Sequence, residues 1–146
     1  MDRVVIVRAG EGTAMTARGS ALRFKALGAD TDRRFSLFER EVPVGARRPA
    51  AHRHPGTSEA FYVLDGTLAL HVEDVDHRIE RGGFALVPAG VAHTFGNGGP
   101  EVLRVLIVHA PALDSYFREL DALDRSGRLD QQSERELMRR HGLEPA

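Results

Sequence analysis

Short runs of alternating hydrophobic and polar residues fill the middle of the chain, and turn-forming residues separate them. A period of two is typical of strands with one buried face, and Gly, Pro and Asp cluster at the breaks, as in Asp65-Gly66. The pattern favours an all-β sandwich or barrel. We predict strands at Leu22–Leu27, Phe35–Val42, Ala60–Leu64, Thr67–Glu73, Arg78–Glu80, Phe84–Val87, His93–Phe95 and Val102–Val108.

The last third of the chain has helical spacing instead. Apolar residues recur every three to four positions from Leu113 to Leu123, and Pro111 suits the first turn of a helix that ends near Gly127. Ser133 and Glu136 resemble the capping box of a second short helix. We predict one domain over residues 1–146, with a barrel at about 20–110 and, at about 111–142, helices that cover one end or face of the sheet.

Composition and charge exclude several classes of partner. The 20 basic and 21 acidic residues nearly cancel, so the chain lacks the field that attracts nucleic acid. Cysteine is absent, which leaves His, Asp and Glu as the metal ligands that the chain offers. The apolar N-terminal run is too short for a signal peptide and nothing later resembles a membrane span, so we expect a cytoplasmic protein without a membrane partner. The run Val4–Val7 is a candidate strand for a neighbour's sheet edge in a homodimer.

Two histidines and a glutamate lie close together in the sequence before the third predicted strand. His52 and His54 are two residues apart, so an extended strand points both imidazoles to one face. Pro55-Gly56 then turns the chain, and Glu59 opens the next strand, where its carboxylate can return to the same point. His93 follows a second turn. Burying these groups in an apolar barrel is costly, and a divalent cation compensates all of them.

These residues carry a resemblance to a known family. Gly45 to Gly66 resembles the first cupin motif, although six residues rather than five separate Gly45 from His52, and Gly82 to Asn97 matches the second motif at every fixed position. The resemblance implies an antiparallel cupin-type β-barrel, or jelly roll, and a metal site at four positions. These positions are His52, His54, Glu59 and His93. A metal-free or sugar-binding barrel remains the alternative.

The ligand set leaves the metal and the role of Glu59 open. Three imidazoles and a carboxylate suit iron, manganese or nickel, and also accept copper or zinc. Glu59 is either a ligand or a catalytic base, a role that quercetinase-like cupins imply. The other histidines lack partner spacing, and we expect none of them to bind the metal. They are His71, His77, His109 and His141.

Even spacing from the ligands places apolar side chains on the same inward face. This spacing predicts an apolar pocket for a small aromatic or polyketide-like substrate, although each member is also an ordinary core candidate. Phe61 and Val63 follow Glu59 at this spacing and Phe95 follows His93, and Phe24 and Phe38 are added as further pocket residues. Arg47 and Arg48 are candidates to bind a carboxylate at the mouth, or are solvated loop charges.

Three functions fit this sequence. The first is a metal-dependent dioxygenase of the quercetinase-like type, in which substrate and dioxygen meet at the three-histidine, one-glutamate centre. The second is a non-redox isomerase, cyclase or lyase that uses the ion as a Lewis acid. The third is a barrel that binds a small ligand without turnover.

Overall fold

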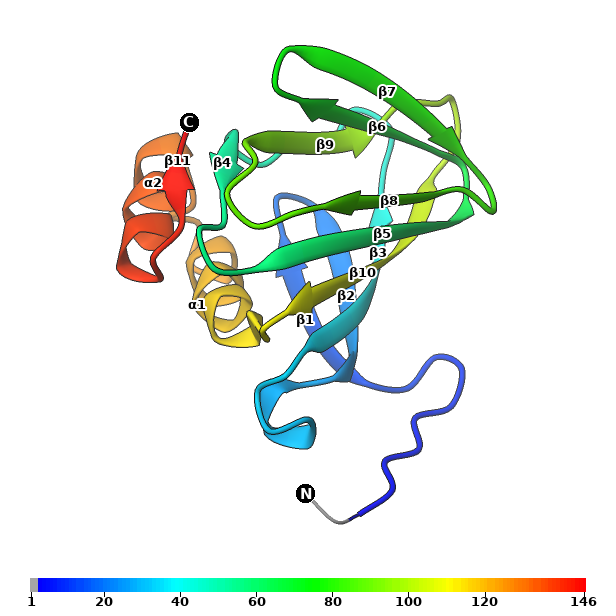
Figure 1. Cartoon of the computed structure of the whole chain (residues 1–146), viewed down its shortest axis with the longest axis vertical. Coiled ribbons are helices and arrows are strands. Elements are labelled where there is room, and N and C mark those ends of the chain that lie inside the picture. Colours follow the sequence, from blue (N-terminus) through cyan, green and yellow to red (C-terminus); the bar gives the residue numbers. More distant parts are fainter. Residues whose placement is uncertain (1–2) are drawn as a thin grey trace.

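Two antiparallel sheets pack face to face in the computed structural model, which describes residues 3–146 (Figure 1). One sheet has the strand order β1-β2-β3-β10-β5-β8, and the other has the order β11-β4-β9-β6-β7. The predicted all-β jelly roll is confirmed. The strands are β1 Thr13–Ala17, β2 Ser20–Ala26, β3 Ser36–Val42, β4 His52–Arg53, β5 Ser58–Asp65, β6 Thr67–Val72, β7 Val75–Glu80, β8 Phe84–Val87, β9 His93–Asn97, β10 Leu103–Ala110 and β11 Glu144–Pro145.

The core lies between the sheets and is built by the period-two alternation. Ile107 on β10 pairs with Phe38 on β3 and with Phe61 on β5, and all three side chains are fully buried. Burial of one such side chain stabilises the fold by roughly 1.5–3 kcal/mol. The same register extends to the end of β10, where His109 faces Glu59. The packing that holds the sheets together therefore also sets the position of polar groups at one end of the core.

Two α-helices and one 3-10 helix complete the fold: α1 Asp114–Arg125, α2 Gln131–Arg140 and the 3-10 turn Gly28–Asp30. α1 packs against β1, which agrees with the predicted covering role. Two predicted details are wrong. Pro111 lies before the first turn of α1 rather than in it. The capping box of α2 joins Asp130 and Ser133, because Asp130 precedes the helix and its carboxylate accepts from the Ser133 amide at 2.8 Å.

Three strands fall outside the predicted set. β1 pairs with β2 through the tight turn at Arg18-Gly19, so the barrel begins at Thr13 rather than near residue 20. Its alanines and threonines give little hydrophobic alternation, which is why the pattern does not reveal it. β4 and β11 have two residues each and pair antiparallel, with Pro145 opposite His52. The end of the chain thus supports the strand that carries His52.

The N-terminal run Val4–Val7 belongs to no strand in this single chain, and Val4 and Ile6 are exposed. Met1 and Asp2, which the predicted domain includes, lie outside the described residues. Within residues 3–146, no helix has the length and apolar character needed to cross a membrane.

Candidate metal centre

The turns predicted around the histidines bring His52, His54 and His93 together. His52 on β4 is the direct cross-strand partner of His93 on β9, and their ring centroids are 4.8 Å apart. His54 follows β4, and its carbonyl accepts a hydrogen bond from the Gly90 amide at 2.8 Å. This bond ties the turn before β5 to the turn before β9. The ring centroids of His52 and His54 are 4.7 Å apart.

Glu59 adds a carboxylate to the three imidazoles. It is the second residue of β5, and its Oε1 lies 2.7 Å from Nε2 of His93 and 3.5 Å from Nε2 of His54. One donor atom from each of the four residues can be chosen so that all lie within 4.8 Å of one another. All four side chains are buried. The structure therefore brings together the four residues that the sequence singled out as ligands.

Backbone carbonyls fix the orientation of two of the imidazoles. Nδ1 of His52 lies 2.6 Å from the Ala50 carbonyl, and Nδ1 of His93 lies 2.9 Å from the Val91 carbonyl. Because a carbonyl only accepts, each Nδ1 donates a proton, which leaves Nε2 of His52 with a lone pair. Nε2 of His93 donates to Oε1 of Glu59 at 2.7 Å and can offer its lone pair to a metal ion only after losing that proton. His54 differs: neither ring nitrogen has a hydrogen-bond partner among residues 3–146, although both are buried. An ion between these lone pairs would satisfy them.

The protonation states favour a ligand role. Burial lowers the pKa of His52 to about 4 and that of His54 to about 3, so both rings are neutral at pH 7. The Glu59 carboxylate outweighs the effect of burial on His93 and raises its pKa. Burial alone would raise the pKa of Glu59, but His109 and His93 hold it well below its usual value. Metal binding at neutral pH therefore requires little deprotonation apart from that of His93.

His109 belongs to this centre, although the sequence analysis gave it no role. Its Nε2 lies 3.1 Å from Oε2 of Glu59, and its ring stacks on that of His54 at 5.4 Å. It is fully buried. The sequence does contain a pattern that indicates its inward position. The alternation of Leu103, Val105 and Ile107 continues to His109, which lies one residue beyond the end of the predicted strand. The remaining histidines, His71, His77 and His141, lie outside the cluster.

A small cavity of about 20 Å³ adjoins the centre. Of the residues predicted to form a substrate pocket, Phe38 and Phe95 form part of its wall. Phe24, Phe61 and Val63 do not line this cavity. Phe24 packs behind Phe38 at 4.7 Å, and Phe61 packs edge-on against Phe95 at 5.2 Å. Side chains face inward along the whole length of the barrel, but only those at the end that carries the candidate ligands line the cavity.

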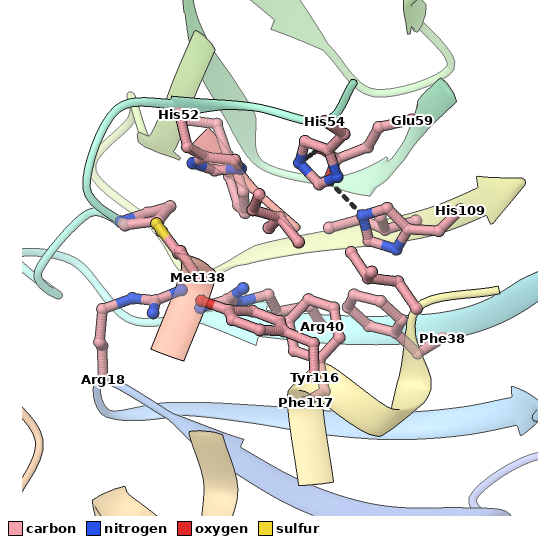
Figure 2. A pocket seen from close by; sticks show the side chains of 15 residues that line it. Arg18, Phe38, Arg40, His52, His54, Glu59, His109, Tyr116, Phe117 and Met138 are labelled. Carbon is pink, nitrogen blue, oxygen red and sulfur yellow. Dashed lines mark ion pairs between the residues drawn. The ribbon is translucent and has the colours of Figure 1, made fainter. Parts of the chain in front are cut away.

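The rest of the wall is more polar than the sequence analysis predicted. Figure 2 shows Arg18, Arg40 and the Tyr116 hydroxyl opposite His52, His54 and Glu59. The candidate mouth residues Arg47 and Arg48 do not line the cavity; the Arg47 guanidinium lies 3.4 Å from Glu134, and Arg48 packs against Gly96. The C-terminal segment completes the wall with Met138 and Leu143.

A jelly roll with three buried histidines and one glutamate at the end of its core defines a class of small barrel with a candidate metal centre. The model of the cupin domain matches residues 38–109, which contain all four candidate ligands and His109. This chain belongs to the cupin superfamily.

Three known proteins are similar to this chain in sequence or in fold. It is 25% identical over 115 residues to quercetin 2,3-dioxygenase from Bacillus subtilis, covering 79% of this chain but only about a third (34%) of the relative. An RmlC-like cupin from Shewanella frigidimarina superposes with a TM-score of 0.64 at 18% identity, covering 80% of this chain and 99% of that one. The polyketide cyclase RemF from Streptomyces resistomycificus superposes with a TM-score of 0.56 at 26% identity, covering 75% and 79%.

Proposed function

We propose that this protein is an enzyme that holds one divalent transition-metal ion through His52, His54, Glu59 and His93 and acts on a small molecule beside it. The observation that carries the proposal is the set of four buried donors within 4.8 Å, of which His54 has no other hydrogen-bond partner in the described part of the chain. Imidazole and carboxylate donors suit iron, manganese and nickel, and also accept copper and zinc.

The proposed reaction is a dioxygenation of the quercetinase type. When bound, the ion would supply a Lewis-acid and redox centre with one or two positions left open by four protein ligands. The similarity to quercetin 2,3-dioxygenase supports this choice. Phe38, Phe95 and Ile107 give the cavity an apolar part of its wall beside the candidate ligands. A cavity of about 20 Å³ holds little more than one water-sized group, so a substrate enters only when wall side chains move.

Glu59 and His109 are the groups that can take up a proton from the substrate. Oε1 of Glu59 faces His93 and His54, whereas Oε2 faces His109. We infer that Oε1 serves the metal and that Oε2, 3.1 Å from Nε2 of His109, is the oxygen that takes up the proton. This division lets Glu59 be a ligand and a base without leaving its position.

A non-redox reaction is the second candidate, and the same acid–base pair favours it. An isomerisation or cyclisation needs a group that removes a proton and returns it, and Glu59 and His109 are both buried beside the cavity. The likeness to the polyketide cyclase RemF supports this alternative.

Oxygen consumption separates the two candidates. Protein loaded with Fe²⁺, Mn²⁺, Ni²⁺ or Co²⁺ is mixed with a panel of flavonols and other enolic or phenolic compounds, and dissolved oxygen and substrate are followed together. We expect metal-dependent oxygen uptake in step with substrate loss, and none with the His52→Ala variant. Substrate loss under argon would support the non-redox reaction instead. A protein that binds no metal after reconstitution would overturn both and leave a binding barrel.

A further inference from the structure

Arg40 is a buried cation without a direct ion-pair partner among the described residues. It lies on β3 and is 2% exposed, and none of the ion pairs formed within residues 3–146 includes it. One of its terminal nitrogens is 3.5 Å from the Ala17 carbonyl, its guanidinium carbon lies 5.2 Å from the centre of the Phe95 ring, and Nε has no hydrogen-bond partner in the described chain. Leaving a buried charge in this state is unfavourable for folding.

Arg18, on the same wall, is compensated. Its guanidinium donates to Glu134 of α2 at 2.8 Å, and the other oxygen of Glu134 accepts from the Ala50 amide at 2.6 Å. Both side chains are fully buried, so this pair connects the β1–β2 turn to α2 and to the segment before His52. The charges of Arg18 and Glu134 cancel. Arg40 therefore provides the uncompensated positive charge of this wall.

The wall also presents a hydroxyl. Tyr116 is buried at the start of α1, and Figure 2 shows its oxygen pointing towards the guanidinium groups of Arg18 and Arg40. Burial, followed by the effect of Arg18, lowers the pKa of Arg40 to about 9, so its guanidinium remains charged at pH 7. Burial raises the pKa of Tyr116 to about 12, so its hydroxyl keeps its proton and can donate.

The charge of the metal centre decides what this wall can bind. Glu59 is among the groups whose negative charge favours the charged form of Arg40. A divalent ion bound to Glu59 would cancel that influence, and the ion, Glu59 and Arg40 together would leave a net charge of about +2 around the cavity. A ligand that balances this charge carries two anionic groups, one for each wall.

We propose that the substrate is a small acid with two anionic oxygen groups, one directed to the metal centre and the other, a carboxylate, paired with Arg40 and the Tyr116 hydroxyl. This inference rests on the proposed metal-dependent function. An arginine fork and a hydroxyl donor match a carboxylate in geometry and charge. Met138 lies between His52 and Arg18 in Figure 2, and its flexible side chain is the wall residue that the ligand displaces.

Calorimetric titration with malonate, succinate and glutarate tests this assignment on cobalt-loaded protein. Succinamate, in which an amide replaces one carboxylate, is the matched probe. We expect at least one diacid to bind, and succinate to bind at least tenfold more tightly than succinamate. Arg40→Met should abolish that preference, while Arg40→Lys keeps part of it. Arg104→Met is the control, because Arg104 lies on β10 with its side chain exposed to solvent.

Thermal unfolding of the same variants separates a binding role from a structural one. Because the Arg40 charge is uncompensated, Arg40→Met should unfold at the same temperature as the wild type or higher, and should take up cobalt equally well. Two results would overturn the inference: wild-type protein that takes up cobalt but binds no diacid, and an Arg40→Met variant that still prefers succinate to succinamate. In both cases normal cobalt uptake would leave the proposed metal site standing. Failure of the wild type to take up cobalt would instead overturn the proposed function.

Discussion

His109 and Glu59 face each other as direct cross-strand partners on β10 and β5, and Nε2 of His109 lies 3.1 Å from Oε2 of Glu59. The contact leaves Oε1 of the same carboxylate directed at His93 and His54. We therefore expect His109 to act on the candidate metal centre through Glu59, as a positioning residue for that carboxylate.

Replacing His109 should weaken metal binding without removing a ligand. In His109→Leu the carboxylate loses its outer partner, and we expect the metal dissociation constant to rise roughly 10- to 100-fold. His109→Gln, whose polar amide can take the place of the imidazole beside Oε2, should recover part of the affinity. His77→Leu is the control, because His77 is exposed and distant from the cluster. Competition titration with a chromophoric chelator measures all three, and equal affinity in His109→Leu and wild type would rule out the positioning role.

The metal-free protein should lose stability as the pH falls from about 6.5 to 4. His52 and His54 have folded-state pKa values of about 4 and 3, so in this range the unfolded chain binds protons that the folded chain does not. Each histidine then contributes a loss of up to about 1.4 kcal/mol per pH unit. His93 has a raised pKa, so its charged form stabilises the fold below pH 6.5 and this contribution is lost at higher pH. Glu59 has a lowered pKa, so its contribution to stability is lost only when the pH falls below the pKa of a glutamate in the unfolded chain.

Denaturant titration in the presence of a chelator measures this dependence. His54→Leu should reduce the slope between pH 6 and 4.5 by about half, because one of the two histidines no longer takes up a proton on unfolding. An unchanged slope in His54→Leu would contradict the assignment.

Phe38 and Phe61 should respond differently to truncation although both are fully buried. Each change to alanine should lower the free energy of unfolding by about 3–5 kcal/mol. Only Phe38 lines the cavity, so only Phe38→Ala should also change the affinity for a ligand of the metal centre, measured as the azide dissociation constant of the cobalt-loaded protein. An equal effect of Phe61→Ala on azide binding would contradict the distinction between cavity wall and core.

A homodimer remains a prediction from the N-terminal run. Val4 is 85% and Ile6 is 71% exposed in the single chain, and β1 and β8 each leave one edge of the six-stranded sheet unpaired within it. We expect Val4–Val7 to add to such an edge in a second copy. Light scattering should show a dimer that becomes a monomer when Val4 and Ile6 are both changed to Asp. A wild-type monomer, or a mutant dimer, would contradict this arrangement.

The sequence was most informative where one short pattern determined both structure and chemistry. His52, His54 and Glu59 lie within eight residues around one turn, so local spacing alone predicted that their side chains converge. Placing His93 beside them also depended on a second turn, Pro88-Ala89-Gly90, which the sequence shows just before it. The strands of the core followed from period-two alternation, whereas β1, β4 and β11 did not, because they are short or weakly apolar and depend on their partners.

The opposite wall of the cavity could not be found in this way. Arg18 lies in a turn, Arg40 on β3 and Tyr116 on α1, and no local pattern connects them. Alternation with Phe38 and Val42 places Arg40 on the inward face of its predicted strand, but it does not reveal that Arg18 and Tyr116 lie beside it. Only the packing of the C-terminal helices against the barrel buries these groups beside the metal centre.

Metal content of purified protein tests the central claim most directly. Wild type, His52→Ala, His93→Ala and the control His77→Ala are loaded with Co²⁺, freed of excess metal by gel filtration and analysed by plasma mass spectrometry, with circular dichroism to confirm folding. The four-residue site predicts about one ion per chain in wild type and His77→Ala and a loss of nearly all metal in the other two. Folded His52→Ala and His93→Ala proteins that retain one ion per chain would contradict it.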